Sequence, residues 1–158
     1  WLTAYCNFSI STSTGLDAIS EVFRVPMVFV NDLPVGNLKT GDTRHIELFK
    51  ILRWKEDKRR LRLSEQISTG AINFYSAQEY QDNGIEIEDN NEEEILDAIL
   101  EMEARLAGTW IEQPGDENLQ RAVFSILESW EGFGDYHGSA RSRISTKFLR
   151  ENRDWFLS

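Results

Sequence analysis

The residues best suited to chemistry lie in a turn of small side chains, residues 11–17, near the start of the chain. The Ser13 and Thr14 hydroxyls can donate hydrogen bonds to phosphate oxygens, and Gly15 has no Cβ to obstruct a close approach of the backbone to a ligand. The free N–H groups of a helix that begins around Leu16 would point at the same spot. The pattern indicates either a phosphate or diphosphate site or a simple helix cap, and the spacing favours neither. No P-loop or dinucleotide-binding motif occurs in the sequence.

Four polar side chains further along are candidates for contacts to the same ligand. Asn31 and Asp32 follow an apolar run that is typical of a buried strand, which would place them at the carboxyl edge of a sheet. There they would contact a base, a ribose or acceptor hydroxyls, although an Asx turn that closes the loop is the simpler interpretation. Arg44 and His45 would neutralise a diphosphate if they faced it, and an ordinary surface loop is the simpler interpretation for them too.

The composition limits the other kinds of site. The 158 residues contain 17 Lys and Arg against 27 Asp and Glu, a formal charge of −10, which argues against nucleic acid as a partner. A single cysteine, Cys6, excludes an internal disulfide, and two histidines without an Asp-x-Asp motif predict no metal site and no bound cofactor. Residues 53–62 are rich in Lys and Arg, which predicts either a solvated hairpin or contact with an anionic membrane surface.

The elements that would position the turn form a βαβ unit at the start of the chain. Polar and apolar residues alternate over 7–11, helical spacing follows over about 15–23, and a proline separates that helix from the apolar run 27–30. Such a short continuous apolar run is typical of a strand that is buried on both faces of a parallel sheet. Residues 31–42 predict a long loop, while 46–54 fit a short strand or a helix equally well.

The second half predicts a further strand and several helices. A short helix over 76–83 leads to a strand over 85–88, and longer helices follow over 91–107, 116–130 and 145–152. We expect the buried stripe of the first long helix to be apolar and to consist of Ile95, Leu96, Ile99, Leu100, Met102 and Leu106. Together these elements predict a single α/β domain, a Rossmann-like parallel sheet flanked by helices, with C-terminal helices.

The first thirty residues resemble the donor-binding half of GT-B glycosyltransferases. The segment 8–17 is followed by the segment 22–31, which matches the order of strand, Ser/Thr-Gly turn, helix, proline and buried strand in that superfamily. The turn is also similar to the heptosyltransferase motif Asp-Thr-Gly-Leu, with Ser13 in place of the aspartate. The whole chain is more closely similar to the C-terminal region of a family of glycosyltransferases from bacterial surface-polysaccharide clusters. That closer match lies in the segments 84–86, 101–110, 137–138 and 148–152.

The resemblance implies that a nucleotide-diphosphate sugar is the donor substrate. It implies that the hydroxyls and amides of residues 13–16 bind the diphosphate and that Asp17 reaches a ribose or sugar hydroxyl. Glu21 is a candidate counterpart of a helix glutamate in the retaining members. The catalytic base of the inverting members lies in the other Rossmann-like half, so the resemblance names no catalytic residue in this chain.

The chain begins at Trp1, and we predict that residues 1–158 are the C-terminal, nucleotide-sugar-binding half of a longer two-lobed protein. We therefore expect it to bind a donor but not to turn it over alone, with an N-terminal Rossmann-like half as its partner. The resemblance implies a cytoplasmic protein that meets a lipid-linked acceptor at the inner face of the membrane. Two alternatives stay open: a noncatalytic interaction module that docks through the apolar tail 155–157, and a nucleotide-sugar epimerase of the same architecture.

Overall fold

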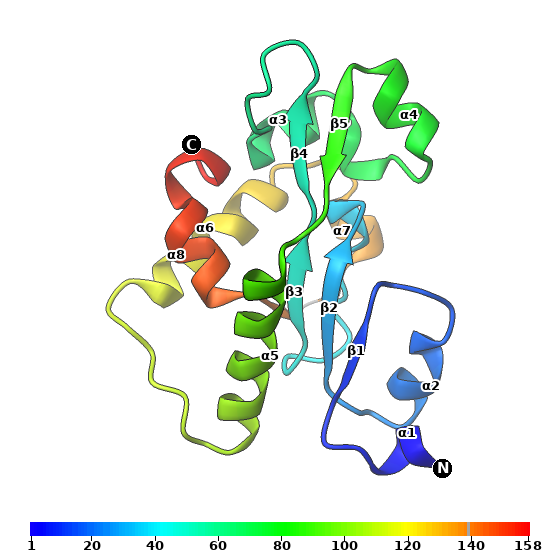
Figure 1. Cartoon of the computed structure of the whole chain (residues 1–158), viewed down its shortest axis with the longest axis vertical. Helices are drawn as coiled ribbons and strands as arrows, with labels where there is room; N and C mark the ends of the chain where they lie inside the picture. The colour runs from blue at the N-terminus through cyan, green and yellow to red at the C-terminus, as the bar shows by residue number, and fades with distance from the viewer. Residues whose placement is uncertain (139) are drawn as a thin grey trace.

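The computed structural model describes residues 1–138 and 140–158 and contains a four-stranded parallel sheet flanked by helices (Figure 1). The strand order is β1 (Ser9–Ser11), β2 (Met27–Asp32), β3 (Ile46–Phe49) and β6 (Arg143–Ile144). Each neighbouring pair in this order is parallel. The predicted α/β class with a Rossmann-like parallel sheet is therefore confirmed.

The predicted βαβ unit is present, although its helix is short. β1 pairs with β2, and α2 (Asp17–Val22) connects the two strands. The helix has six residues because the turn before it extends to Leu16 and because Arg24, two residues after its end, adopts a left-handed φ of 53°. So few aligned peptide groups give α2 only a small dipole.

A bulge at the end of β2 decides which side chains face which side of the sheet. Phe29 lies opposite Glu47, but the register then shifts so that Asp32, rather than Asn31, lies opposite Phe49. Asn31 is the extra residue and has a left-handed φ of 52°. Because side chains alternate along a strand, the insertion turns Asp32 to the same face as Phe29 and Glu47. Without it, Asp32 would face the core with Val28.

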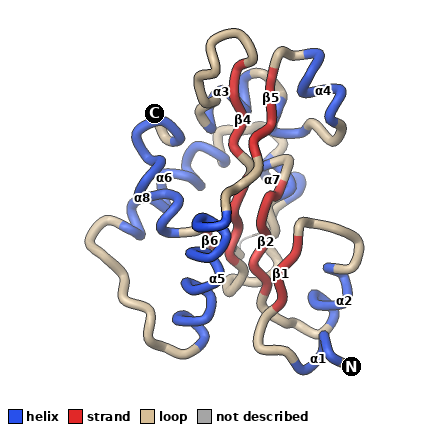
Figure 2. Tube along the Cα trace, in the orientation of Figure 1, coloured by secondary structure: helices blue, strands red, loops and turns tan. Residues whose placement is uncertain are grey.

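The segment 46–54, for which the sequence fitted strand and helix equally, forms two strands. β3 is followed after one residue by β4 (Ile51–Trp54), which leaves the parallel sheet and pairs antiparallel with β5 (Ile85–Glu88) (Figure 2). A bridge from Arg53 to Arg60 closes the expected hairpin. Carboxylates pair with its basic side chains, in Arg53–Glu88, Lys58–Glu86 and Arg59–Glu65. The positive charge of this hairpin is thus largely balanced within the chain.

Helices flank the parallel sheet and the antiparallel β4–β5 pair. α5 (Glu92–Leu106) packs on β2 and β3, and α8 (Thr146–Phe156) packs on α5 and on α6 (Asp116–Leu127). The remaining short helices are α1 (Leu2–Tyr5), η1 (Val35–Asn37), α3 (Leu63–Ser68), η2 (Ala71–Asn73), α4 (Ala77–Asp82) and α7 (Phe133–Tyr136). No helix among the described residues combines the length and the apolar character needed to cross a membrane.

The expected apolar stripe of α5 is confirmed only in part: Met102 is buried and Ile95 packs against the core. The buried residues of α5 are Ala98, Glu101 and Met102, whereas the expected stripe members Leu96, Leu100 and Leu106 are exposed. The apolar tail at the C-terminus is the last turn of α8, where Phe156 is buried in the chain's own core and Trp155 packs edge-on against it. The tail is therefore not free to dock on another domain.

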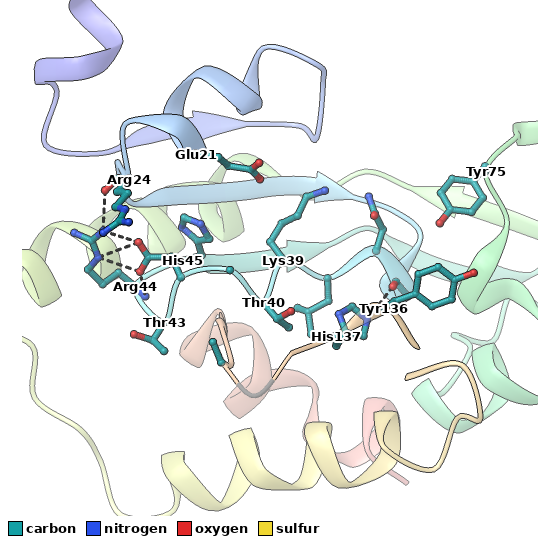
Figure 3. Close-up of a pocket in the computed structure, with 16 residues that line it drawn as sticks. Glu21, Arg24, Lys39, Thr40, Thr43, Arg44, His45, Tyr75, Tyr136 and His137 are labelled. Carbon is teal, nitrogen blue, oxygen red and sulfur yellow. Dashed lines mark hydrogen bonds and ion pairs between the residues drawn. The ribbon is translucent and has the colours of Figure 1, made fainter. Parts of the chain in front are cut away.

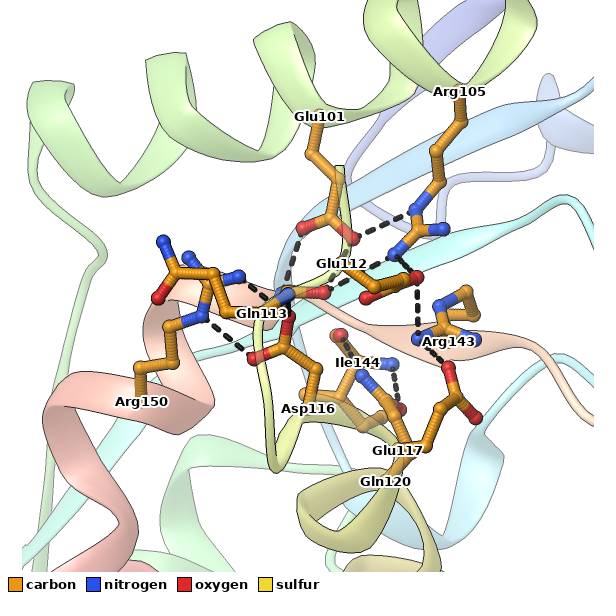
Figure 4. A network of polar contacts seen from close by, with 11 residues as sticks. Glu101, Arg105, Glu112, Gln113, Asp116, Glu117, Gln120, Arg143, Ile144 and Arg150 are labelled. Carbon is orange, nitrogen blue, oxygen red and sulfur yellow. Dashed lines mark hydrogen bonds and ion pairs between the residues drawn. The ribbon is translucent and has the colours of Figure 1, made fainter. Parts of the chain in front are cut away.

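A network of charged and polar groups joins the C-terminal helices (Figure 4). The buried Glu101 carboxylate of α5 accepts hydrogen bonds from Arg105 Nε at 2.9 Å and from the Thr146 N–H at 2.7 Å and hydroxyl at 2.6 Å. Asp116 accepts two hydrogen bonds from Arg150, and this arginine holds the pKa of Asp116 at about 2. Because these carboxylates are buried and mutually satisfied, the network serves the packing of α5, α6 and α8.

Candidate functional site

Two adjoining cavities lie near the carboxyl ends of β1 and β2, and a third, larger cavity extends toward the amino ends of β2 and β3. The first, of about 370 Å³, is lined by the turn after β1, including Thr12, Thr14 and Asp17. The second, of about 460 Å³, is lined by Thr12, Asn31, Lys50 and Tyr75. The third, of about 800 Å³, also reaches Tyr75. The first two cavities share Thr12 in their linings, and the last two share Tyr75. The carboxyl ends of parallel strands are where open α/β sheets bind ligands.

The predicted diphosphate turn lies open to solvent. Thr14, Gly15 and Leu16 are exposed, and a Cβ added to Gly15 would meet no atom within 4 Å. Ser13 is half-buried and has a left-handed φ of 56°, which non-glycine residues seldom adopt. Its hydroxyl points inward and is buried. The turn therefore presents Thr14 and free backbone to a ligand, while Ser13 faces the sheet.

The structure gives Asp17 a partner within the chain. Its carboxylate accepts a hydrogen bond from the Ser11 hydroxyl, and the residue is buried at the start of α2. Its own N–H donates to the carbonyl of Thr14 at 3.0 Å. Asp17 thus stabilises the turn from within, and the expected contact to a ribose or sugar hydroxyl stays a prediction.

Asn31 is held by a reciprocal pair of hydrogen bonds. Its N–H donates to Asn90 Oδ1 at 2.9 Å, and the Asn90 N–H donates to Asn31 Oδ1 at 2.7 Å. The Asn90 amide also donates to the Phe49 carbonyl. These bonds fix the bulge, so the side-chain oxygen of Asn31 is engaged within the fold even though the residue lines the second cavity.

Asp32 is completely buried beside Glu47, a residue that the sequence analysis did not single out. Burial raises the pKa of Asp32, and the Ser13 hydroxyl and the Lys39 ammonium oppose that rise. Burial also raises the pKa of Glu47 well above its usual range, and the Asp32 charge adds to the effect. Asp32 therefore has no exposed surface that a ligand could contact.

The largest cavity contains the other three candidates (Figure 3). Glu21 of α2 lines it, and Arg44 is bound there by Asp42 at 2.5 Å and by the Arg24 carbonyl at 2.7 Å. His45 is buried, and its Nδ1 accepts a hydrogen bond from the Met27 N–H at 3.1 Å. Burial lowers the pKa of His45, which keeps the ring neutral and argues against the expected role in neutralising a diphosphate.

The structure brings together side chains that local patterns did not indicate. Lys39 extends along the cavity, with its Nζ 5.9 Å from the centroid of the Phe29 ring. Tyr75 and Tyr136 lie at the end of the cavity opposite Arg44, and both are exposed (Figure 3). Lys50 at the end of β3 reaches the second cavity and pairs with Asp89 at 2.7 Å. A cationic group and an aromatic ring are thus available to each of the two larger cavities.

Comparison with protein-family models, with characterised proteins and with solved structures finds no match to this chain.

Proposed function

We propose that the chain binds the nucleotide-diphosphate sugar of a glycosyltransferase that builds bacterial cell-surface polysaccharide. The observation that carries the proposal is the open turn at residues 13–16, which borders the cavity near the carboxyl end of β1. The resemblance of residues 8–31 to the donor-binding half of GT-B enzymes supports the choice of ligand. The family itself remains part of the proposal.

The charges near the turn suggest how a diphosphate would be bound. α2 is too short to supply much helix dipole, so the Thr14 hydroxyl and the exposed backbone amides would contact the phosphates. Lys50 would supply positive charge from the second cavity, and Tyr75 offers a ring on which a base can stack. Such donors would stabilise the negative charge that develops on the leaving diphosphate.

The exposed edge of the sheet supports the proposed partner, an N-terminal Rossmann-like half. Among the described residues β1 is an edge strand, and β2 is the one strand that pairs with it. Large apolar side chains gather on and around it, and the exposed ones include Trp1, Tyr5, Ile10, Leu16 and Val22. An N-terminal Rossmann-like half that packs on this surface would cover them. We include in this proposal a cytoplasmic location and a lipid-linked acceptor at the membrane surface.

The same apolar surface favours a second candidate function, a noncatalytic interaction module. Exposed apolar patches of this kind are typical of protein–protein contacts. A thermal-shift screen with UDP, GDP, ADP and dTDP separates the two functions. A ligand at a hundred times its Kd should raise the free energy of unfolding by about 2.7 kcal/mol. No shift with any of the four nucleotides would favour the interaction module.

Replacing Gly15 by valine should weaken binding of the nucleoside diphosphate that gives the largest shift by at least about tenfold. The added side chain would occupy the space next to the exposed backbone, while the fold accommodates it because no atom lies within 4 Å of the new Cβ. Calorimetry on the purified chain measures the affinity. The matched control is Gly41→Val, which has equally open surroundings but lies in the largest cavity. Equal affinities for the wild type and Gly15→Val would contradict a diphosphate site at the turn.

A further inference from the structure

Four buried oxygen atoms gather at one point of the sheet and have no partner in good hydrogen-bond geometry among residues 1–138 and 140–158. They are the Ser13 hydroxyl, both carboxylate oxygens of Asp32, and Oε2 of Glu47. Native proteins leave few buried polar atoms unpaired, and each one is destabilising. Four in one place indicate that the cluster needs a hydrogen-bond donor that ionised side chains do not supply.

A single proton would complete it. The carboxyl groups of Asp32 and Glu47 lie within hydrogen-bonding reach of each other, and neither residue has exposed surface. Two ionised carboxylates cannot donate to each other, and their charges repel. One shared proton provides the donor and leaves one negative charge, which the nearby Lys39 ammonium balances. The other titratable group that faces the pair, Tyr80, has its pKa raised by burial and is neutral.

A divalent cation suits the cluster less well than a proton does. Magnesium and calcium require about six or more oxygen ligands, and magnesium usually retains several waters. No group of three His, Cys, Asp or Glu side chains suited to a metal occurs in the part of the chain that the structure describes. Lys39 already supplies a positive charge, so a dication would leave the buried site with excess charge.

We propose that Asp32 and Glu47 share one proton and act as a positioning pair for the ligand-binding turn. The pair connects three segments: Ser13 of the turn lies against Asp32, and Glu47 Oε1 accepts a hydrogen bond from the Lys39 N–H at 3.0 Å. Ser13 has a left-handed backbone that needs outside support, and the neighbouring Asp32 carboxyl group is the candidate acceptor for its hydroxyl. The proposal rests on the proposed function for the identity of the ligand only.

The experiment measures backbone order at residues 12–16 by NMR relaxation in the whole chain at about pH 6 and about pH 9. Asp32→Leu removes the acceptor, and the order parameters of the turn should fall from about 0.85 to below about 0.6. Asp32→Asn and Glu47→Gln each imitate the pair with one proton, so they should keep the turn ordered at both pH values. The wild type should keep the turn ordered for as long as the folded pair holds its proton. If both carboxyl groups were ionised in the folded protein, the amide variants would not imitate the pair and the turn would lose order in them.

The control is Gln66→Leu, which removes another buried oxygen without a partner, in α3 and away from the turn. If Asp32→Leu leaves the turn as ordered as Gln66→Leu does, the proposal is overturned. Order that requires added Mg²⁺ and disappears with a chelator would also overturn it, in favour of a cation. Calorimetry with UDP, GDP, ADP and dTDP then tests the ligand separately. Loss of order without any nucleotide binding would support the positioning pair and contradict the proposed function.

Discussion

Replacing Glu101 by alanine should lower the free energy of unfolding by about 3–5 kcal/mol, because it removes the acceptor from a buried charged network. Glu101 is 1% exposed and binds both the N–H and the hydroxyl of Thr146, the first residue of α8. Ser145, which precedes the helix, makes no capping hydrogen bond with its side chain. A carboxylate of α5 therefore caps α8, and its loss leaves the start of α8 without an acceptor, while Arg105 keeps its pairing to Glu112.

Thermal and urea denaturation would measure this loss, with an expected fall in Tm on the order of 10 °C. Glu101→Gln should cost less, about 1–2 kcal/mol, since the amide oxygen still accepts from Thr146. Glu103→Ala is the matched control, because Glu103 is an exposed glutamate on the same helix and should change stability by no more than about 0.5 kcal/mol. Equal effects of Glu101→Ala and Glu103→Ala would show that the Glu101 carboxylate does not stabilise α8.

Glu101 also shows what kind of structural information the sequence lacked. The helix predicted over 91–107 was foreseeable from Asn91 as its cap and from its periodicity. The structure confirms the helix over 92–106 and adds a capping box between Asn91 and Glu94. The buried face of this helix could not be predicted, because a glutamate in a helix normally faces solvent. The partner that makes its burial favourable lies 45 residues away at Thr146, and local patterns do not report such a distance.

The candidate site likewise has features that local sequence patterns predicted and others that they did not. The turn at residues 13–16 and the strand that precedes it were predictable from local residue types, as was the position of Asn31 and Asp32 at the carboxyl edge. The pairing of Asp32 with Glu47 was not, because it depends on the bulge at Asn31 and on the register of β3. His45 was misjudged for a related reason: its ring is buried against Phe29 by the neighbouring strand.

Replacing Glu47 by glutamine should make the protein more stable than the wild type at neutral and alkaline pH. An unfolded glutamate loses its proton near its ordinary pKa of 4.5, whereas burial raises the pKa of folded Glu47 well above that value. Between the two values the folded state holds a proton that the unfolded state has released, so wild-type stability falls as the pH rises. The fall amounts to at most about 1.4 kcal/mol for each pH unit. A glutamine side chain has no ionisable proton, so the Glu47→Gln variant should lack this dependence.

The range from about pH 7 to about pH 9 isolates the buried Asp32–Glu47 pair, because the groups with lowered pKa values titrate elsewhere. His45 and His137 have lowered pKa values, so they are neutral in both states above their ordinary pKa of 6.5. Carboxylates with lowered pKa values, such as Glu65 and Asp116, are ionised in both states there. Urea denaturation at several pH values should therefore show a declining free energy of unfolding for the wild type and a flatter one for Glu47→Gln. Glu103→Gln serves as the exposed control and should follow the wild type. Parallel curves for the wild type and Glu47→Gln would mean that Glu47 is ionised in the folded protein, and then the buried pair would need a balancing charge other than a proton.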